Sequence, residues 1–206
     1  MRERDKQIIR DLDRFMCLSR DHIVNLYFSH TKQPITQANI VLKRLRRDGY
    51  IKCNTQYRKY IYMLSDCKMK PNSQKINHYL AIADFYVQIR RIQEPKEFIP
   101  EHKDKKGNPE ADAFMIWRGL PWFVEVQCSY FSSKQISDKL NRYEKYYING
   151  KWEEAEWQPS NKRIFPLIWI TGKGKYDVGT RPFRVVQGDI SDIVKMMTPK
   201  QKPDPL

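Results

Sequence analysis

The stretch from Asn108 to Gln127 constrains the fold more than any other part of the chain. Two arms rich in β-branched and aromatic residues flank a bend at Arg118 to Pro121, where Gly and Pro interrupt the pattern. We therefore predict two short antiparallel strands joined by a tight turn. Alternation along the second arm sends Phe123, Glu125 and Gln127 to one face of the sheet and the residues between them to the other.

The acidic residues of this hairpin form a candidate metal site. A turn centred between Gly119 and Leu120 would place Asp112 opposite Gln127 and make Glu125 its diagonal neighbour. Diagonal neighbours on paired strands lie roughly 7–8 Å apart at the backbone, so both carboxylates could reach one cation. Two carboxylates on one strand face suit a hard divalent ion, Mg²⁺ or Mn²⁺.

An acidic residue on a strand is more often solvated than functional, because most charged side chains stay exposed. Glu125 differs because the strand around it is apolar, and a buried carboxylate is costly unless it is paired or bound to a metal. We predict Asp112 and Glu125 as metal ligands, with either Glu101 or Glu110 as a third ligand.

The charge of the chain indicates an anionic partner. Its 206 residues carry a net charge of +14, with a pI of about 9.6. The first 70 residues hold 16 of the 38 basic residues but only 7 of the 24 acidic ones, so the positive charge is concentrated there. A polyanion such as nucleic acid explains this balance. A membrane surface is the alternative, but no long apolar run, signal peptide or lipidation motif is present.

The cysteines argue against zinc and disulfides. No two of the four form a CxxC pair, and no histidine stands at a matching spacing. We expect reduced thiols in a cytoplasmic protein.

The N-terminal residues predict three helices followed by a hairpin. Apolar stripes mark helices from Arg4 to Phe15, after an N-cap at Ser19, and from an N-cap at Thr36 to a stop at Gly49. Two strand patterns then flank a polar turn at residues 54–56, the second running from Tyr57 to Leu64. This order is typical of a winged helix-turn-helix, which we assign to residues 1–66.

Such a domain offers residues for double-stranded DNA. The third helix would bring cations to phosphates and amides to base edges, and the hairpin would contact the neighbouring backbone. The predicted DNA-binding residues are Gln37, Asn39, Lys43, Arg44, Arg46, Arg47, Arg58 and Lys59. The alternative is a winged helix used only for protein contacts. Four cations within five residues, from Lys43 to Arg47, favour DNA.

A polar segment from Asp66 to Ser73 separates a second domain, which we place at residues 73–198. Its patterns predict a long helix to about Gln93, a strand at 97–101, the hairpin, a helix at 132–149 and a buried strand at 164–171. The run Gly172 to Lys175 lacks the spacing of a phosphate-binding loop and indicates a turn.

The order helix, strand, hairpin, helix, strand resembles the core of the PD-(D/E)XK nucleases. The resemblance implies an α/β (α+β) chain, with a winged helix-turn-helix followed by a restriction-endonuclease-like αβββαβ core. It also implies that Asp112 and Glu125 hold Mg²⁺, and that Gln127 takes the position of the catalytic lysine. Gln127 cannot supply a positive charge, but Lys134 or Lys139 could do so from the following helix.

A closer similarity is to the replication-relaxation family of plasmid and phage proteins, which pair a winged helix with a nuclease-like domain. The similarity is carried by the first 65 residues and by His78–Tyr86, Pro109–Asp112, Phe123–Val126 and Lys139–Tyr147. It implies a role in plasmid or phage DNA replication or relaxation. Two hypotheses follow: a metal-dependent DNA endonuclease with Asp112, Glu125 and Gln127 as catalytic residues, or a non-catalytic DNA-binding regulator. Either could act as a homodimer.

Overall fold

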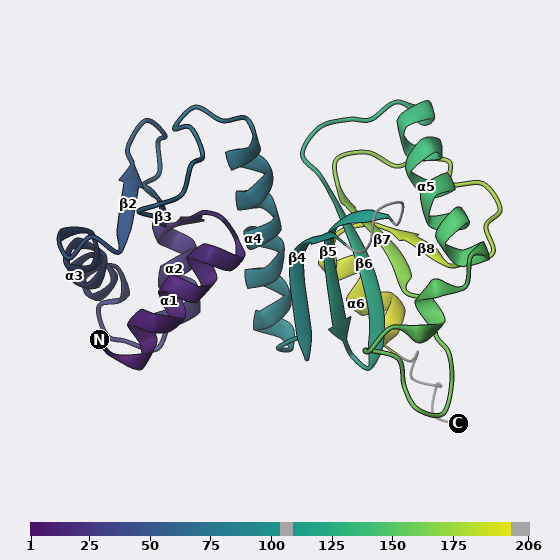
Figure 1. Ribbon diagram of the computed structural model, residues 1–206, viewed down its shortest axis with the longest axis horizontal. Coiled ribbons are helices and arrows are strands. Elements are labelled where there is room, and N and C mark those ends of the chain that lie inside the picture. Colours follow the sequence, from purple (N-terminus) through teal and green to yellow (C-terminus); the bar gives the residue numbers. More distant parts are fainter. Residues whose placement is uncertain (104–108, 199–206) are drawn as a thin grey trace, which may run out of the picture. The chain divides into compact units, whose positions relative to one another are not determined.

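The computed structural model describes residues 1–103 and 109–198, in two compact units that divide between Glu94 and Pro95. Helices and two sheets are present in the described residues, which confirms the predicted mixed α/β class (Figure 1). The division places the long helix of residues 75–92 with the N-terminal unit. The predicted boundaries of a DNA-binding domain at residues 1–66 and a nuclease-like domain at residues 73–198 stay a prediction.

The N-terminal unit contains four helices and a small antiparallel sheet of strand order β1-β3-β2. Its elements are α1 (Glu3–Arg14), β1 (Leu18–Ser19), α2 (Arg20–Tyr27), α3 (Pro34–Arg47), β2 (Ile51–Asn54), β3 (Ile61–Leu64) and α4 (Lys75–Ile92). Apolar side chains of the helices and of β3 form its core, among them Ile8, Leu12, Leu42, Ile61 and Ile76.

Capping residues explain where these helices begin and end. Ser19 caps α2 as predicted, because its hydroxyl accepts a hydrogen bond from the backbone N–H of His22 at 3.1 Å. The predicted cap of α3 at Thr36 is wrong: α3 begins at Pro34, whose fixed φ and missing N–H suit the first helical position. The predicted stop is confirmed, since Gly49 follows α3 with a φ of +79°.

The hairpin of this unit has a shorter second strand and a longer loop than predicted. Strand β3 starts at Ile61 instead of Tyr57, and residues 55–60 form the loop. Asn54 ends β2, because its side-chain oxygen accepts the backbone N–H of Gln56 at 3.0 Å and its amide donates to Pro71 O at 2.7 Å. These bonds turn the chain out of the ladder.

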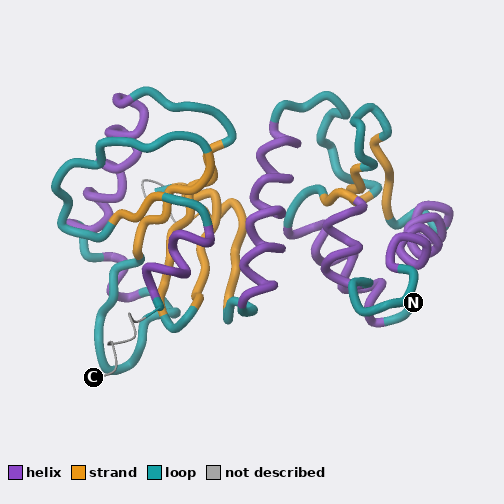
Figure 2. The backbone as a smooth tube through the Cα atoms, turned by 180° about the vertical axis from the view of Figure 1, so that it is seen from behind, coloured by secondary structure: helices purple, strands orange, loops and turns teal. Residues whose placement is uncertain are grey.

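The C-terminal unit is a five-stranded mixed sheet of order β4-β5-β6-β7-β8. Strands β4 to β6 are antiparallel, whereas β6, β7 and β8 are parallel. Its elements are β4 (Glu97–Lys103), β5 (Glu110–Trp117), β6 (Leu120–Gln127), α5 (Ser133–Ile148), the 3₁₀ turn η1 (Lys151–Glu154), β7 (Leu167–Gly172), β8 (Val185–Gln187) and α6 (Ile190–Met197). Figure 2 shows the strands from behind.

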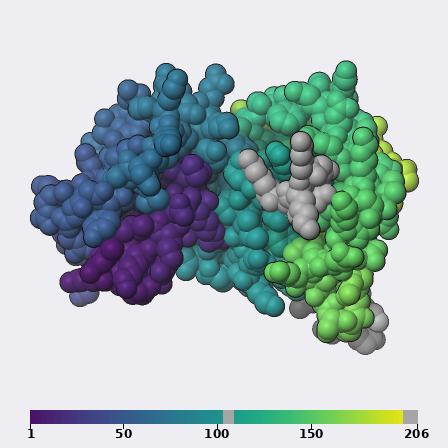
Figure 3. All heavy atoms as spheres, in the orientation of Figure 1, coloured from purple at the N-terminus to yellow at the C-terminus, as the bar shows by residue number. Residues whose placement is uncertain are grey.

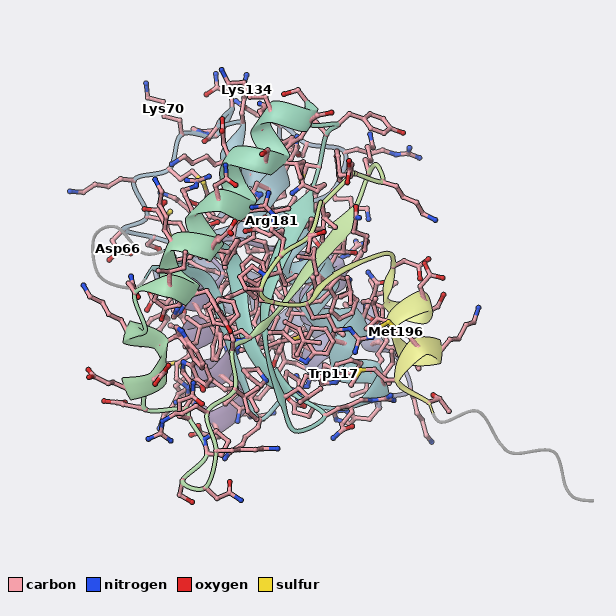
Figure 4. All side chains as sticks on the ribbon, turned by 90° about the vertical axis from the view of Figure 1, so that its right-hand side faces the viewer. Asp66, Lys70, Trp117, Lys134, Arg181 and Met196 are labelled. Atoms are coloured by element: carbon pink, nitrogen blue, oxygen red, sulfur yellow. The ribbon has the colours of Figure 1, made fainter. Side chains whose placement is uncertain are left out.

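Helices α5 and α6 lie on opposite sides of this sheet (Figure 4). Phe114 and Phe123 face α5 and pack with its buried Ile136, Leu140 and Tyr143. The other face carries Trp117, Trp122 and Trp169, whose ring centroids are 5.5–6.4 Å apart. Because both faces are covered, β6 and β7 are apolar along most of their length.

The turn between β5 and β6 differs from the prediction by one residue. Trp117 pairs with Leu120, so only Arg118 and Gly119 make the turn, with φ of +51° and +74°. Two successive positive φ angles match the twist of a two-residue hairpin. The ladder runs to the pair Ala113 and Val124. Continuing that register brings Asp112 beside Glu125, not opposite Gln127 as predicted.

Gly172 is expected to be required for the close approach of the β6 and β7 backbones at Gln127. A Cβ there would lie 2.4 Å from the backbone oxygen of Gln127, and the φ of +102° is already unfavourable for other residues. Gly172→Ala should lower the free energy of unfolding by about 3 kcal/mol, from left-handed strain and steric overlap together. Urea titration followed by circular dichroism would measure the loss.

Gly179→Ala is the matched control, because Gly179 has a φ of +60° but nothing within 4 Å of its Cβ position. It should lose only about 1 kcal/mol, the cost of the left-handed backbone alone. Equal losses in the two variants would contradict the argument from space at Gly172.

Candidate functional site

Glu125 lies in the middle of β6 and is buried, with 1% of its surface exposed. It faces α5, as the predicted alternation along the strand requires, and so do Phe123 and Gln127. On its other side, β6 runs parallel to β7, where Glu125 is in register with Ile170. A carboxylate is therefore embedded in an apolar sheet and needs a partner.

Helix α5 supplies two partners. The Lys139 ammonium forms an ion pair with Glu125 Oε2, and the Tyr143 hydroxyl donates to Oε1 at 2.5 Å. Lys139 and Tyr143 are four residues apart, so both project from the same face of the helix. Both carboxylate oxygens of Glu125 are therefore engaged by α5.

Burial dominates the electrostatics of this group. Loss of solvent raises the pKa of Glu125 to about 7, although the Lys139 charge and the two hydrogen bonds act in the opposite direction. The nearby negative charge of Asp112 adds to the rise. Burial and the neighbouring Glu125 likewise raise the pKa of Tyr143 well above its usual range, so that Tyr143 keeps its proton and donates it.

Asp112 is half-buried at the point where the β5–β6 ladder stops. Its Oδ2 accepts the backbone N–H of Val126 at 2.7 Å, so a side chain here takes the place of a ladder carbonyl. The expectation that Asp112 and Glu125 lie close together thus agrees with the structure, although the register behind it differed.

A third carboxylate stands next to Asp112. The pairs Pro100–Ala113 and His102–Ala111 place Glu101 opposite Asp112, and the two side chains have oxygens within 4.8 Å of each other. Glu101 holds a φ of +49°, which is uncommon for a residue with a side chain. Glu110, the other predicted third ligand, is exposed at the start of β5. Glu101, Asp112 and Glu125 therefore form a row across three neighbouring strands.

Gln127, the predicted occupant of the catalytic lysine position, is 4% exposed. Among the described residues its side-chain oxygen has no hydrogen-bond partner. Gln127 lines a small recess with Glu125, Lys139 and Tyr143, and the recess leaves no space for a water molecule. An uncharged amide without room for water gives this position no acid–base chemistry.

The role of Asp112 and Glu125 as metal ligands stays a prediction, and the structure shows how the charge of Glu125 is balanced by the protein itself. Magnesium normally keeps several bound waters and binds through one or two carboxylates, whose oxygens have two lone pairs each. Lys139 and Tyr143 each engage one oxygen of Glu125, and the recess on the α5 side of Glu125, which Asp112 does not line, has no space for water. The Lys139 ammonium therefore balances the charge of Glu125 in this arrangement.

Sequence reasoning named two lysines for this charge, and the structure distinguishes them. Lys139 pairs with Glu125, whereas Lys134 is exposed in the first turn of α5 (Figure 4). Tyr143 was not among the predicted site residues. Its spacing of four residues from Lys139 was the one available signal that both would meet the same group.

The predicted DNA-binding residues divide into two groups. Most are exposed, on α3 or in the loop of residues 55–60: Gln37, Asn39, Lys43, Arg46, Arg47, Arg58 and Lys59. The surface of α3 lies at the left edge of the view in Figure 3. Two of these cations have exposed acidic neighbours, since Arg47 pairs with Asp48 at 2.9 Å and Lys59 with Asp21 at 3.6 Å. Exposed pairs of this kind are weak and leave the cation available.

Arg44 forms the second group alone. Its guanidinium pairs at 2.5 Å with Asp5, whose side chain is only 2% exposed. The charge of Arg44 therefore neutralises a buried acid within the N-terminal unit. Removal of Arg44 would mainly lower the free energy of unfolding.

Lys139→Met should lower the free energy of unfolding by about 2–4 kcal/mol, because it leaves Glu125 buried without a cation. Lys134→Met, on the exposed side of the same helix, should change stability by less than about 0.5 kcal/mol. Adding Glu125→Gln to Lys139→Met should recover part of the loss, and chemical denaturation of the four proteins of this cycle would measure the coupling. Additive effects of the two substitutions would contradict the pairing.

Comparisons with known proteins agree with one of the resemblances. No curated protein and no solved structure matches the chain. No helix in the described part of the chain is both long and apolar enough to span a membrane. The family model described as replication-relaxation matches residues 9–159, which include most of the N-terminal unit, the row of carboxylates and α5. The chain therefore belongs to the replication-relaxation family.

Proposed function

We propose that this protein binds double-stranded DNA through its N-terminal unit and acts in plasmid or phage DNA replication or relaxation. Family membership supports the setting. The order α1, β1, α2, α3, β2, β3 and the three-stranded sheet β1-β3-β2 support assignment of this unit as a winged helix. In that arrangement α3 is the helix that enters the major groove.

The exposed side of α3 carries the proposal. The helix buries Ala38, Val41, Leu42 and Leu45, and it contains no acidic residue between Pro34 and Arg47. Lys43, Arg46 and Arg47 are all exposed. Cations near a helix C-terminus also favour the helix dipole, but that effect does not call for three of them. A phosphate backbone accounts for the whole set.

The loop of residues 55–60 offers a second contact. Arg58 and Lys59 are exposed there, together with Tyr60, which is 51% exposed. In a winged helix this loop is the wing, and it would hold the phosphate backbone beside the groove that α3 enters.

We further infer that the C-terminal unit has a nuclease-like core that does not cleave DNA in this protein. The antiparallel strands β4 to β6, the helix α5 and the parallel strand β7 follow the order of the PD-(D/E)XK core. Lys139 compensates the charge of Glu125, and the recess that Gln127 shares with Glu125 has no space for water. DNA binding without cleavage is the function that this geometry favours.

Lys43→Ala, Arg46→Ala and Arg47→Ala should each weaken binding to duplex DNA several-fold. Each should also reduce the slope of log affinity against log salt by roughly 0.9, because one phosphate contact is lost. Fluorescence anisotropy with a random-sequence duplex at several salt concentrations measures both quantities. Arg10→Ala is the charge-matched control, since Arg10 lies on α1 and pairs with Glu3. Unchanged affinity in all three α3 variants would overturn the proposal.

Purified protein should leave supercoiled and linear DNA uncut with either Mg²⁺ or Mn²⁺, because Gln127 carries no charge and has no space beside it for an attacking water. Gel analysis of plasmid topology tests this expectation. Metal-dependent nicking that disappears in Glu125→Gln would reinstate the endonuclease hypothesis and contradict the non-catalytic assignment.

A further inference from the structure

An isoleucine occupies the centre of the outward side of α3. With 3.6 residues per turn, Thr36, Ile40, Lys43 and Arg47 follow each other at spacings of four, three and four residues and share one stripe of the helix. This stripe lies opposite the buried residues Ala38, Val41, Leu42 and Leu45. The Ile40 side chain is 58% exposed, the most exposed of the large apolar residues of α3.

Exposure alone does not make Ile40 unusual, because single apolar residues are common on protein surfaces. Its neighbours make it informative. Lys43 and Arg47 flank it on the following turns and carry charge, so the surface around Ile40 repels other basic surfaces and attracts an anionic one. The partner must therefore be anionic overall and present an apolar group at the centre of the contact.

The major groove of DNA has this combination. Phosphates line its edges, and the C5-methyl group of thymine is the apolar group that it displays. Resting on the proposed DNA-binding function, we propose that Ile40 contacts a thymine methyl group in the major groove and selects for thymine at that position. Thr36, one turn earlier on the same stripe, brings a second methyl group to the same side.

A second exposed isoleucine on the same helix supplies the comparison. Ile35 is 51% exposed, but it lies five residues before Ile40 and therefore about 140° away around the helix axis. It does not belong to the outward stripe. The two side chains match in chemistry and nearly in exposure, so they differ mainly in direction.

The test removes one methyl group from the DNA and the side chain from the protein. A duplex preferred by the wild-type protein is first selected from a random library. Each thymine of that duplex is then replaced singly by deoxyuridine, which lacks only the C5-methyl group. Anisotropy measures binding of every duplex by the wild-type protein, Ile40→Ala and Ile35→Ala.

We expect deoxyuridine at one or two positions to weaken wild-type binding by about fourfold, the effect of one methyl group removed from an apolar contact. Ile40→Ala should bind the parent duplex on the order of tenfold more weakly and should not respond to deoxyuridine at those positions. Ile35→Ala should keep both the affinity and the response of the wild-type protein.

Three results would overturn the inference, and they separate it from the proposed function. If wild-type protein binds duplex DNA but responds to deoxyuridine nowhere, the thymine contact fails and DNA binding survives. If Ile40→Ala responds to deoxyuridine as the wild type does, another residue makes the contact. If wild-type protein binds no duplex, the proposed function fails together with the inference.

The alternative partner for this surface is a second copy of the chain. Sedimentation velocity without DNA tests whether Ile40 mediates such self-association. If Ile40 contacts DNA, we expect wild-type protein and Ile40→Ala to have the same mass in solution. A wild-type dimer that becomes a monomer in Ile40→Ala would assign Ile40 to self-association and would overturn the thymine contact.

Discussion

The burial of one carboxylate organises the C-terminal unit. Glu125 sits in an apolar strand of a sheet that is covered on both faces, so its charge has to be met by a neighbour. Lys139 and Tyr143 meet it from one turn of α5. The same helix packs Ile136 and Leu140 against the sheet, so polar and apolar contacts select one rotation of α5 about its axis. A different rotation would bury Glu125 alone.

The N-terminal unit also contains a buried carboxylate that pairs with a cation. Asp5 of α1 is buried, and Arg44 of α3 reaches it, with Arg4 at 3.8 Å on its other oxygen. This pairing withdraws one cation from the basic run of α3 and leaves Lys43, Arg46 and Arg47 outside. The inward direction of Arg44 follows from helical geometry, since Arg44 lies one turn after the buried Val41 and directly before the buried Leu45.

Local patterns predicted most elements, and their failures have local causes. Ser19, Gly49 and the apolar stripes of α3 and α5 were read correctly because each depends on neighbours in the sequence. The β5–β6 register was misplaced because the turn was predicted between Gly119 and Leu120, whereas Arg118 and Gly119 form it, both with positive φ. The partners of Glu125 and Asp5 depend on residues 14 and 39 positions away, and no short pattern reports such distances.

The distribution of indoles has a practical consequence. All five tryptophans, Trp117, Trp122, Trp152, Trp157 and Trp169, belong to the C-terminal unit, and three of them pack together on one face of its sheet. Fluorescence that is excited at wavelengths where only tryptophan absorbs therefore reports on the C-terminal unit alone. The N-terminal unit has only tyrosine fluorescence. Tryptophan fluorescence thus follows the melting of the C-terminal unit without any label and without a contribution from the N-terminal unit.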